Sequence, residues 1–221
     1  MYNVNEIFET IQGEGTFTGV PSVFVRLQGC PVGCPWCDTR QTWDTLPTDE
    51  RDFGAIITKT GDSPIWAAVD ANDILTHLQN SYTARHVVIT GGEPCIYDLR
   101  PLTERLESAG YRCQIETSGT YPVETTEGTW VTVSPKINMR GKLPVLESAL
   151  ERANEIKHPV GTESDIEKLE ALLDGVALRE NVEIALQPIS QKPRATALCI
   201  ETCIKRNWRL SIQTHKYLDI A

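Results

Sequence analysis

Residues 22–39 read SVFVRLQGCPVGCPWCDT, an apolar run that leads directly into three closely spaced cysteines. The run at Ser22–Leu27 is short and rich in valine, which is typical of a buried β-strand. The residues after it include Pro31, Gly33 and Pro35, which favour a loop over a helix. Because α/β folds place their chemistry in loops that follow parallel strands, this segment predicts both a fold class and a functional site.

The three cysteines of this loop, Cys30, Cys34 and Cys37, are separated by three and then two residues, so their thiolates can turn toward one centre. Thiolates hold iron–sulfur clusters, and a cubane has four irons. A cubane bound by only three protein thiolates keeps one iron open, for example for the amino and carboxylate groups of a methionine moiety. An open metal position is typical of a catalytic site. The spacing therefore predicts a [4Fe–4S] cluster with one open iron.

Two other interpretations of the loop require a fourth ligand. A structural zinc site would recruit Cys95 or a histidine, and a closed electron-transfer cluster would recruit Cys95. A non-catalytic, metal-stabilised interaction module is the alternative from a different functional class. The chain has seven cysteines, and we expect the four outside the loop to be buried packing residues: Cys95, Cys113, Cys199 and Cys203.

Further apolar runs predict strands at His86–Thr90, Arg112–Thr117, Trp130–Ser134, Glu155–His158, Val182–Gln187 and Arg209–Gln213. Helical patterns lie between many of them, at Asp70–Asn80, Asp98–Ala109, Val145–Ala153, Asp165–Leu173 and Arg194–Arg206. This alternation predicts a mostly parallel sheet, because parallel neighbours need a crossover connection. Residues 117–128, TSGTYPVETTEG, are too polar for a crossover helix. The expected fold is therefore α/β, a shortened or partial TIM-like barrel.

The chain of 221 residues is long enough for one core and short for two full domains, so we expect a single domain over 1–221. Within it we expect the cysteine loop at 28–40 and an irregular insertion at about 42–69, between Ser22–Leu27 as the first strand and the first crossover helix. No apolar run approaches the ~20 residues of a membrane span, and the N-terminus lacks the order of a secretory signal. The net charge of −9, without a dense Lys/Arg run, disfavours a nucleic-acid partner. We expect a cytoplasmic protein.

The cysteine pattern followed by Asp-Thr, with ITGGEP downstream at 89–94, resembles the radical S-adenosylmethionine (SAM) superfamily. The segments FETIQGEG at 8–15, VSPK at 133–136 and LQPIS at 186–190 narrow the resemblance to the 7-carboxy-7-deazaguanine synthase family, of enterobacterial type. The resemblance extends from Glu6 to Ala221. The nearest rival is a glycyl-radical activating enzyme, but QGEG and the late QTHKYL at 213–218 favour the deazapurine family.

The resemblance implies a lyase of queuosine biosynthesis, a tRNA modification pathway. Its reaction would be a radical ring contraction of 6-carboxy-5,6,7,8-tetrahydropterin to 7-carboxy-7-deazaguanine, with loss of ammonia. The implied cofactors are one [4Fe–4S] cluster with an open iron, SAM that is regenerated at each turnover, and Mg²⁺. The implied partners are a flavodoxin-like reductase as electron donor and a second copy of the chain in a homodimer.

Arg26 can be interpreted from its position in the strand. Val23, Val25 and Leu27 share one face of the strand, and Phe24 and Arg26 share the other. Parallel strands are usually buried on both faces, so this arginine needs an anion, which its planar fork can bind with two hydrogen bonds. A buried Asp or Glu is one candidate, and the resemblance places the substrate carboxylate there instead.

The resemblance also assigns the other site residues. Thr39 offers a hard oxygen of the type that Mg²⁺ prefers, and it would be the only protein ligand of that ion. Glycines let a ligand approach the backbone closely, and polar side chains can recognise a pterin edge. The expected SAM contacts are Trp36, Cys37, Asp38, Gly92, Ser118, Ser134, Pro135, Lys136 and Gln187. The expected substrate contacts are Ile11, Gln12, Gly13, Glu14, Arg26, Thr90, Glu116, His215 and Ala221. No residue is assigned a catalytic role beyond these contacts.

Overall fold

The computed structural model describes residues 1–218, which form one nine-stranded sheet with helices packed against it. The strands are β1 (Tyr2–Ile11), β2 (Pro21–Leu27), β3 (Ala67–Val69), β4 (His86–Gly91), β5 (Arg112–Thr117), β6 (Trp130–Val133), β7 (Glu155–Val160), β8 (Glu183–Pro188) and β9 (Arg209–Leu210). Their order in the sheet is β3-β1-β2-β4-β5-β6-β7-β8-β9.

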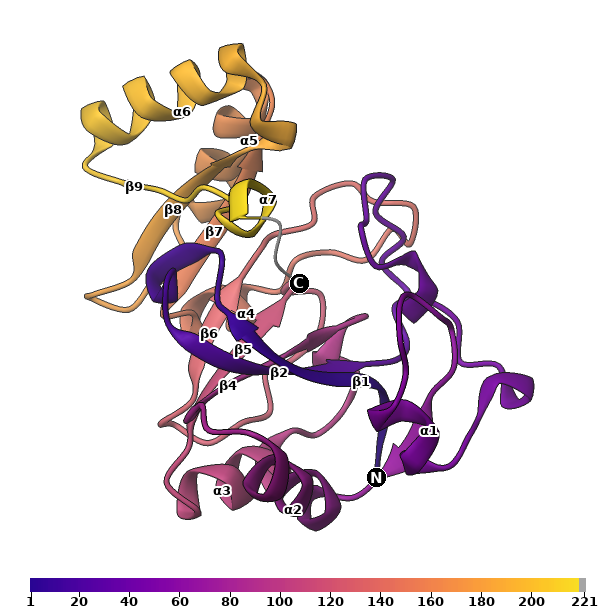
Figure 1. The fold of residues 1–221 in the computed structure, drawn as a ribbon. Coiled ribbons are helices and arrows are strands. Elements are labelled where there is room, and N and C mark those ends of the chain that lie inside the picture. The colour runs from indigo at the N-terminus through magenta and orange to yellow at the C-terminus, as the bar shows by residue number, and fades with distance from the viewer. Residues whose placement is uncertain (219–221) are drawn as a thin grey trace.

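The sheet is mostly parallel and open. From β2 through β4 to β9 each strand pairs in parallel with the one before it, whereas β1 runs antiparallel to both β2 and β3. Within residues 1–218 the edge strands β3 and β9 do not pair with each other, so the curved sheet in Figure 1 is a partial barrel. The expected α/β architecture is confirmed.

The helices are α1 (Phe53–Ile57), α2 (Ala71–Ser81), α3 (Arg100–Ser108), α4 (Glu147–Arg152), α5 (Glu163–Leu173), α6 (Pro193–Arg206) and α7 (His215–Leu218). All five helices expected from the sequence are present, with ends shifted by at most two residues. Asp70 caps α2 by accepting hydrogen bonds from the backbone of Asn72 and Asp73. Figure 1 shows α2 and α3 near one end of the sheet and α5 and α6 near the other. Within residues 1–218 none of the helices has the length and apolar character needed to traverse a lipid bilayer.

Two expectations about the first third of the chain are corrected. The strand at Ser22–Leu27 is the second one, because β1 precedes it, and a register shift between Val4 and Glu6 breaks the alternation that would have marked β1 in the sequence. The segment 42–69 is not irregular throughout, since it contains α1 and β3. β3 has only three residues, and it is a strand because it pairs with β1, so it could not be predicted once β1 was missed.

The two faces of the sheet differ in polarity. On β2, Val23, Val25 and Leu27 are fully buried in the apolar core, while Phe24 and Arg26 point to the concave side, as the alternation predicts. The concave side carries a chain of hydrogen bonds across four strands. His86 Nε2 lies 2.8 Å from Gln114 Oε1, Gln114 Nε2 donates to Thr132 Oγ1 at 3.2 Å, and Thr132 Oγ1 donates to Glu155 at 2.9 Å.

The loop between β1 and β2 closes the bottom of the concave side. Its 3₁₀ helix η1 (Gly15–Phe17) places the Phe17 ring 4.5 Å from the His86 ring and 5.1 Å from the Trp130 ring, measured between centroids. The opposite end, where the parallel strands terminate, stays open. The fold therefore offers a polar pocket at the carboxyl ends of its strands, the usual position of an active site in a barrel.

Candidate active site

A cavity of about 530 Å³ lies within the curve of the sheet. That volume suits a small-molecule site. Of the expected site residues that the structure describes, all but Pro135 line this cavity; Pro135 is buried outside its wall. Ala221 lies outside the described residues. The lining residues range from Phe8 to Lys216, so segments far apart in the chain converge here.

The cysteine loop forms one wall of the cavity. Cys30, Cys34 and Cys37 all line it, and all three are free thiols. The Cys37 backbone N–H donates to the Cys34 carbonyl at 3.2 Å, which turns the loop back on itself. Burial raises the pKa of the Cys30 thiol to about 11 and also raises that of Cys34. Metal binding must therefore displace protons from these sulfurs.

The fourth-ligand interpretations lose support from the position of Cys95. This residue is 5% exposed and packs in the apolar core with Leu99 and Leu102. Cys113 lies in the same core, and Cys199 and Cys203 lie in the core beneath α6. The expectation that these four cysteines are packing residues is confirmed. Within residues 1–218 no group of three or more His, Cys, Asp or Glu side chains is arranged to hold one metal ion. A cubane distributes its thiolates over different irons, so its ligands need not converge on one ion.

The GGEP turn at 91–94 packs directly on the start of the cysteine loop. The Gly92 N–H donates to the Leu27 carbonyl and the Glu93 N–H to the Gly29 carbonyl, both at 2.8 Å. A Cβ at position 92 would lie 2.1 Å from the Gly29 oxygen, and one at position 91, where φ is +121°, would lie 2.3 Å from the Leu27 backbone. Only glycine fits at either position. The turn and the cysteine loop therefore hold each other in place.

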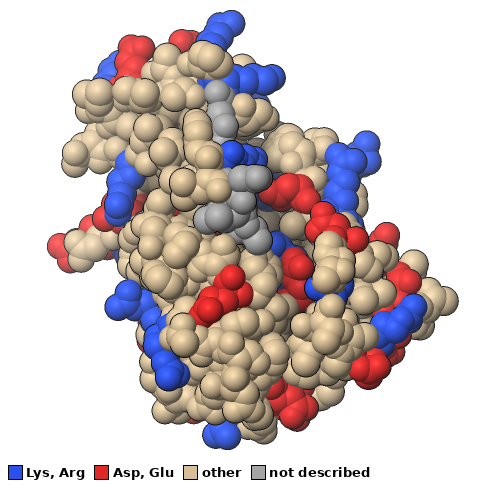
Figure 2. Space-filling model, viewed as in Figure 1, with Lys and Arg blue, Asp and Glu red and all other residues tan. Residues whose placement is uncertain are grey.

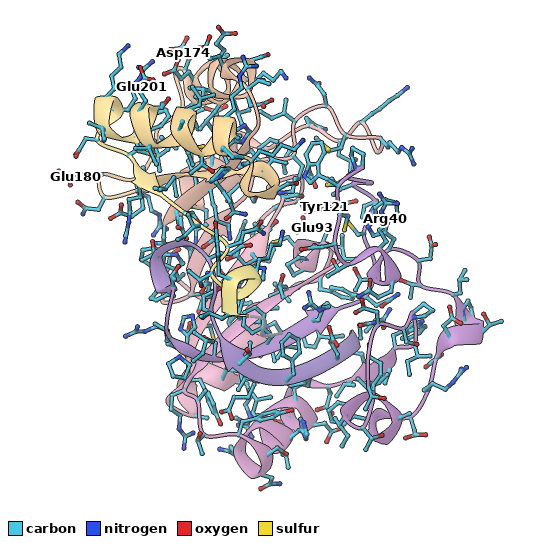
Figure 3. All side chains as sticks on the ribbon, turned by 45° about the horizontal axis from the view of Figure 1, so that its top comes forward. Arg40, Glu93, Tyr121, Asp174, Glu180 and Glu201 are labelled. Atoms are coloured by element: carbon cyan, nitrogen blue, oxygen red, sulfur yellow. The ribbon has the colours of Figure 1, made fainter. Side chains whose placement is uncertain are left out.

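Glu93, which the sequence did not single out, anchors this turn to the end of β5. Its side chain is 1% exposed and accepts hydrogen bonds from Thr117 Oγ1 at 2.6 Å, from the Ser118 N–H at 2.8 Å and from the Ser118 hydroxyl. Figure 3 shows Glu93 within the fold, whereas the labelled acidic residues Asp174, Glu180 and Glu201 lie at its outer edge. The hydroxyl of Ser118, an expected SAM contact, is thus already oriented by a buried carboxylate.

Lys157 lies at the centre of the polar wall and was also missed from the sequence. Its Nζ lies 2.7 Å from Glu14 Oε2 and 3.0 Å from Glu116 Oε2. Gln213 Nε2 donates to the other oxygen of Glu14 at 2.7 Å. The sequence does contain a signal for Lys157, the same one that singled out Arg26: a cation within an apolar strand of a parallel sheet. The strand here is EIKHPV.

One cation facing two carboxylates separates their pKa values. Burial would raise the pKa of Glu14, but the charge and hydrogen bond of Lys157, together with Gln213 and His215, lower that pKa to about 2. Burial raises the pKa of Glu116 to about 7, despite the same lysine. Burial would lower the pKa of Lys157, but Glu116 and Glu14 raise it above its ordinary value. The trio therefore stays charged at Lys157 and Glu14 and exchanges a proton near neutrality at Glu116.

Arg26 has a protein partner as well as a place on the cavity wall. Its Nε pairs with Glu6, the acidic partner considered as an alternative, and its guanidinium lies 5.5 Å from the centre of the Phe8 ring. Within residues 1–218 its two terminal nitrogens have no hydrogen-bond acceptor. The substrate carboxylate stays a prediction for those two nitrogens.

The head and tail of the chain meet at the cavity. The Thr214 N–H donates to the Gly13 carbonyl at 2.9 Å, and a Cβ on Gly13 would lie 2.5 Å from His215 Nδ1. Figure 1 shows α7 beside the turn that follows β1. The expected contacts Gln12, Gly13 and His215 are thus brought to one rim.

Thr39 precedes the short 3₁₀ helix η2 (Arg40–Thr42), but its side chain does not cap that helix. Its hydroxyl lies 3.6 Å from Cys37 Sγ and lines the cavity. Lys136 is a second cation on the cavity wall and is partly buried; its Nζ donates to Ser134 Oγ at 2.5 Å, and burial lowers its pKa. Gln187 Oε1 accepts a hydrogen bond from Ser211 at 3.0 Å.

The comparisons with known proteins agree with this geometry. The family model described as "Radical SAM superfamily" matches residues 24–128. The chain is 62% identical to the 7-carboxy-7-deazaguanine synthase of Escherichia coli strain K12, over 100% of this chain and 99% of the relative. It belongs to the 7-carboxy-7-deazaguanine synthase family of radical SAM enzymes.

Other members of the 7-carboxy-7-deazaguanine synthase family extend the similarity. The Buchnera aphidicola relative is 47% identical over 99% of both chains, and the Aquifex aeolicus relative is 36% identical over 98% of this chain and 93% of its own. A crystal structure of QueE from Escherichia coli superimposes with a TM-score of 0.94 at 62% identity, covering 96% of this chain and 93% of that chain.

Membership of the radical SAM superfamily implies a [4Fe–4S] cluster and SAM as cofactors. The residues present fit them. The three thiolates are the donors that an iron–sulfur cluster requires, and they share one cavity wall. Gly92, at which a Cβ has no room, presents bare backbone beside that wall.

Proposed function

We propose that this chain converts 6-carboxy-5,6,7,8-tetrahydropterin to 7-carboxy-7-deazaguanine, with loss of ammonia, in queuosine biosynthesis. One observation carries the proposal: the three cysteines and the described pterin contacts, which range from Ile11 to His215, line a single cavity. The names of the full-length relatives support the same reaction.

Cys30, Cys34 and Cys37 would hold the cluster, and residues at the ends of the parallel strands on the same cavity would bind SAM. When bound, cluster and SAM supply the radical chemistry that removes a hydrogen atom from the pterin. Trp36 and Asp38 contact SAM from the cysteine loop. Gly92, Ser118, Ser134, Lys136 and Gln187 contact it from the strand ends. The partly buried Lys136 ammonium on the cavity wall suits the carboxylate of SAM, because a cation that is largely withdrawn from water is stabilised by an anion.

The substrate lies against the concave face. Arg26 binds the pterin carboxylate with its two terminal nitrogens, while its Nε keeps Glu6. Gln12 and Glu14 recognise the ring edge, and Ile11, Gly13, Thr90 and His215 complete the pocket. Lys157 fixes the charge of Glu14 as a hydrogen-bond acceptor. Glu116, whose pKa of about 7 lets it carry a proton, donates to or accepts from the ring.

Thr39 supplies a hard oxygen for Mg²⁺ beside the cluster. The Thr39 hydroxyl lies on the cavity wall and does not cap η2, which supports this role.

We also propose that the chain works as a homodimer in the cytoplasm and receives single electrons from a flavodoxin-like reductase. The exposed Pro35 and Trp36 on the outer turn of the cysteine loop offer that reductase a short path to the cluster. Acidic and basic groups are mixed over the face shown in Figure 2, which does not favour a nucleic-acid partner.

The test is an anaerobic assay of the reconstituted protein with the pterin, SAM, Mg²⁺ and a chemical reductant. Formation of 7-carboxy-7-deazaguanine supports the proposal. Stoichiometric 5′-deoxyadenosine without deazapurine, together with formation of a glycyl radical on a partner protein, would instead support the activating-enzyme alternative.

A further inference from the structure

Trp43 contacts the cysteine loop at two of the three expected cluster ligands. It directly follows η2, and its indole Nε1 lies 3.3 Å from Cys37 Sγ. Its carbonyl oxygen accepts a hydrogen bond from the Cys30 N–H at 2.9 Å. The preceding carbonyl, of Thr42, accepts from the Gly29 N–H at 2.7 Å. The first residues of the 42–69 segment therefore hold the cysteine loop in place through these three hydrogen bonds.

The indole contact has a definite direction. An indole nitrogen is a donor only, so its hydrogen must point at the sulfur. The Trp43 ring lines the cavity wall, and the Arg40 guanidinium lies 5.9 Å from its centre. The ring is thus held between the cysteine loop and a cation.

A hydrogen bond to a cluster sulfur has an electronic effect. The reduced cluster carries one more negative charge than the oxidised cluster, so an N–H donor on a ligand sulfur stabilises the reduced form more. Hydrogen bonds of this kind are among the features that set the reduction potentials of iron–sulfur clusters. The family's chemistry requires the reduced form, which makes the potential a property on which turnover depends.

We propose that Trp43 is a positioning residue that donates an N–H···S hydrogen bond to the Cys37 ligand and thereby raises the reduction potential of the cluster. The inference rests on the proposed function, because it requires the cluster at these cysteines. It assigns a role to the beginning of the 42–69 segment.

The experiment compares Trp43→Phe with Trp66→Phe in the reconstituted protein. Trp66 is a matched control, because it lies in the same segment and is 7% exposed, but its Nε1 donates to the Leu46 carbonyl at 3.1 Å. Iron and sulfide contents are measured first. The midpoint potential is then measured by an anaerobic redox titration that is followed by electron paramagnetic resonance (EPR).

We expect Trp43→Phe to keep its cluster and to lower the potential, so that the ratio of reduced to oxidised cluster at a fixed potential falls by about threefold. Trp66→Phe should match the wild type. A fully loaded Trp43→Phe protein with an unchanged potential would overturn the inference and leave the proposed function intact. A wild type that binds no cluster would overturn both.

Two further measurements keep the inference testable if the phenylalanine variant loses its cluster. Replacing Trp43 by 3-benzothienylalanine, in which sulfur takes the place of the ring N–H, keeps the shape of the side chain, and it should also lower the potential. In the wild type labelled with ¹⁵N-indole, the reduced cluster should show a hyperfine coupling to one indole nitrogen that Trp66→Phe retains. Absence of that coupling contradicts the hydrogen bond.

Discussion

The Nζ of Lys157 lies 2.7 Å from Glu14 Oε2, although 143 residues separate them in the chain. Lys157 comes from the middle of β7, and Glu14 belongs to the loop that follows β1. The ion pair therefore ties the start of the chain to the far half of the sheet. It also holds in the cavity the carboxylate that we expect to recognise the pterin.

Replacing Lys157 by methionine leaves Glu14 and Glu116 buried without their cation. We expect Lys157→Met to lower the free energy of unfolding by about 3 kcal/mol, as breaking a buried pair usually does. Urea unfolding monitored by circular dichroism measures this change. Lys168→Met is the control, since Lys168 is half exposed in its pair with Asp165, and it should change stability by less than about 0.5 kcal/mol. Equal effects of the two substitutions would contradict the central role of Lys157.

Glu116 should make stability depend on pH in a window near neutrality. Its pKa of about 7 in the folded chain exceeds its ordinary value of 4.5, so between these values the folded form binds more protons than the unfolded form. The free energy of unfolding should then fall as the pH rises through the window, by up to about 1.4 kcal/mol per pH unit. Glu116→Gln should remove this contribution, so the variant gains stability relative to the wild type from pH 5 to pH 7.

The control for that series is Glu124→Gln, because Glu124 is an exposed carboxylate paired with Arg100. Denaturant midpoints at each pH provide the measurement. A difference between Glu116→Gln and wild type that stays constant from pH 5 to pH 7 would show that Glu116 does not take up its proton there.

Gly92→Ala tests the packing of the GGEP turn on the cysteine loop. The added Cβ would lie 2.1 Å from the Gly29 carbonyl oxygen, so one of the two loops must move. We expect lower iron content and a SAM affinity reduced at least about tenfold, equivalent to about 1.4 kcal/mol. Iron analysis and calorimetric titration with SAM measure the two effects. Gly161→Ala, where the nearest atoms lie at 3.6 Å, should behave as wild type. Normal SAM binding by Gly92→Ala would refute the close packing.

Arg26→Lys should raise KM for the pterin by about tenfold or more and leave SAM binding within about twofold, because lysine cannot present the planar fork. The pair with Glu6 can survive the change, so folding should be little affected. Arg112→Lys is the control, since Arg112 lies over the Phe17 ring at the closed end of the barrel. Equal weakening of pterin and SAM binding would argue against the carboxylate role of Arg26.

The parallel part of the fold was predictable because its signals are local. Valine-rich runs such as Ser22–Leu27 and the amphipathic helices between them mark a buried sheet without any long-range information. β1 and β3 were not predictable, because β1 loses its alternation at the bulge and β3 is defined only by pairing with β1. Short strands of this kind acquire their structure from tertiary pairing.

The site was predictable where chemistry is concentrated in one stretch, as in Cys30, Cys34 and Cys37. It was not predictable where function depends on partners that are distant in the chain. Glu93 stood in a recognised motif, yet its contacts with Thr117 and Ser118 come from the next strand. Lys157 forms ion pairs with Glu14 and Glu116 only in the folded, curved sheet. The ion pair of Arg26 with Glu6 likewise depends on the unpredicted β1.

One measurement tests directly whether the three cysteines bind a cluster that leaves one iron open for SAM. The anaerobically reconstituted protein is reduced, and its EPR spectrum is recorded with and without SAM, beside a determination of iron and sulfide. We expect about four irons per chain and a reduced-cluster signal that changes when SAM is added, and we expect Cys34→Ala to lose the irons and the signal. A colourless protein that binds one zinc ion, or a cluster whose signal ignores SAM, would contradict it.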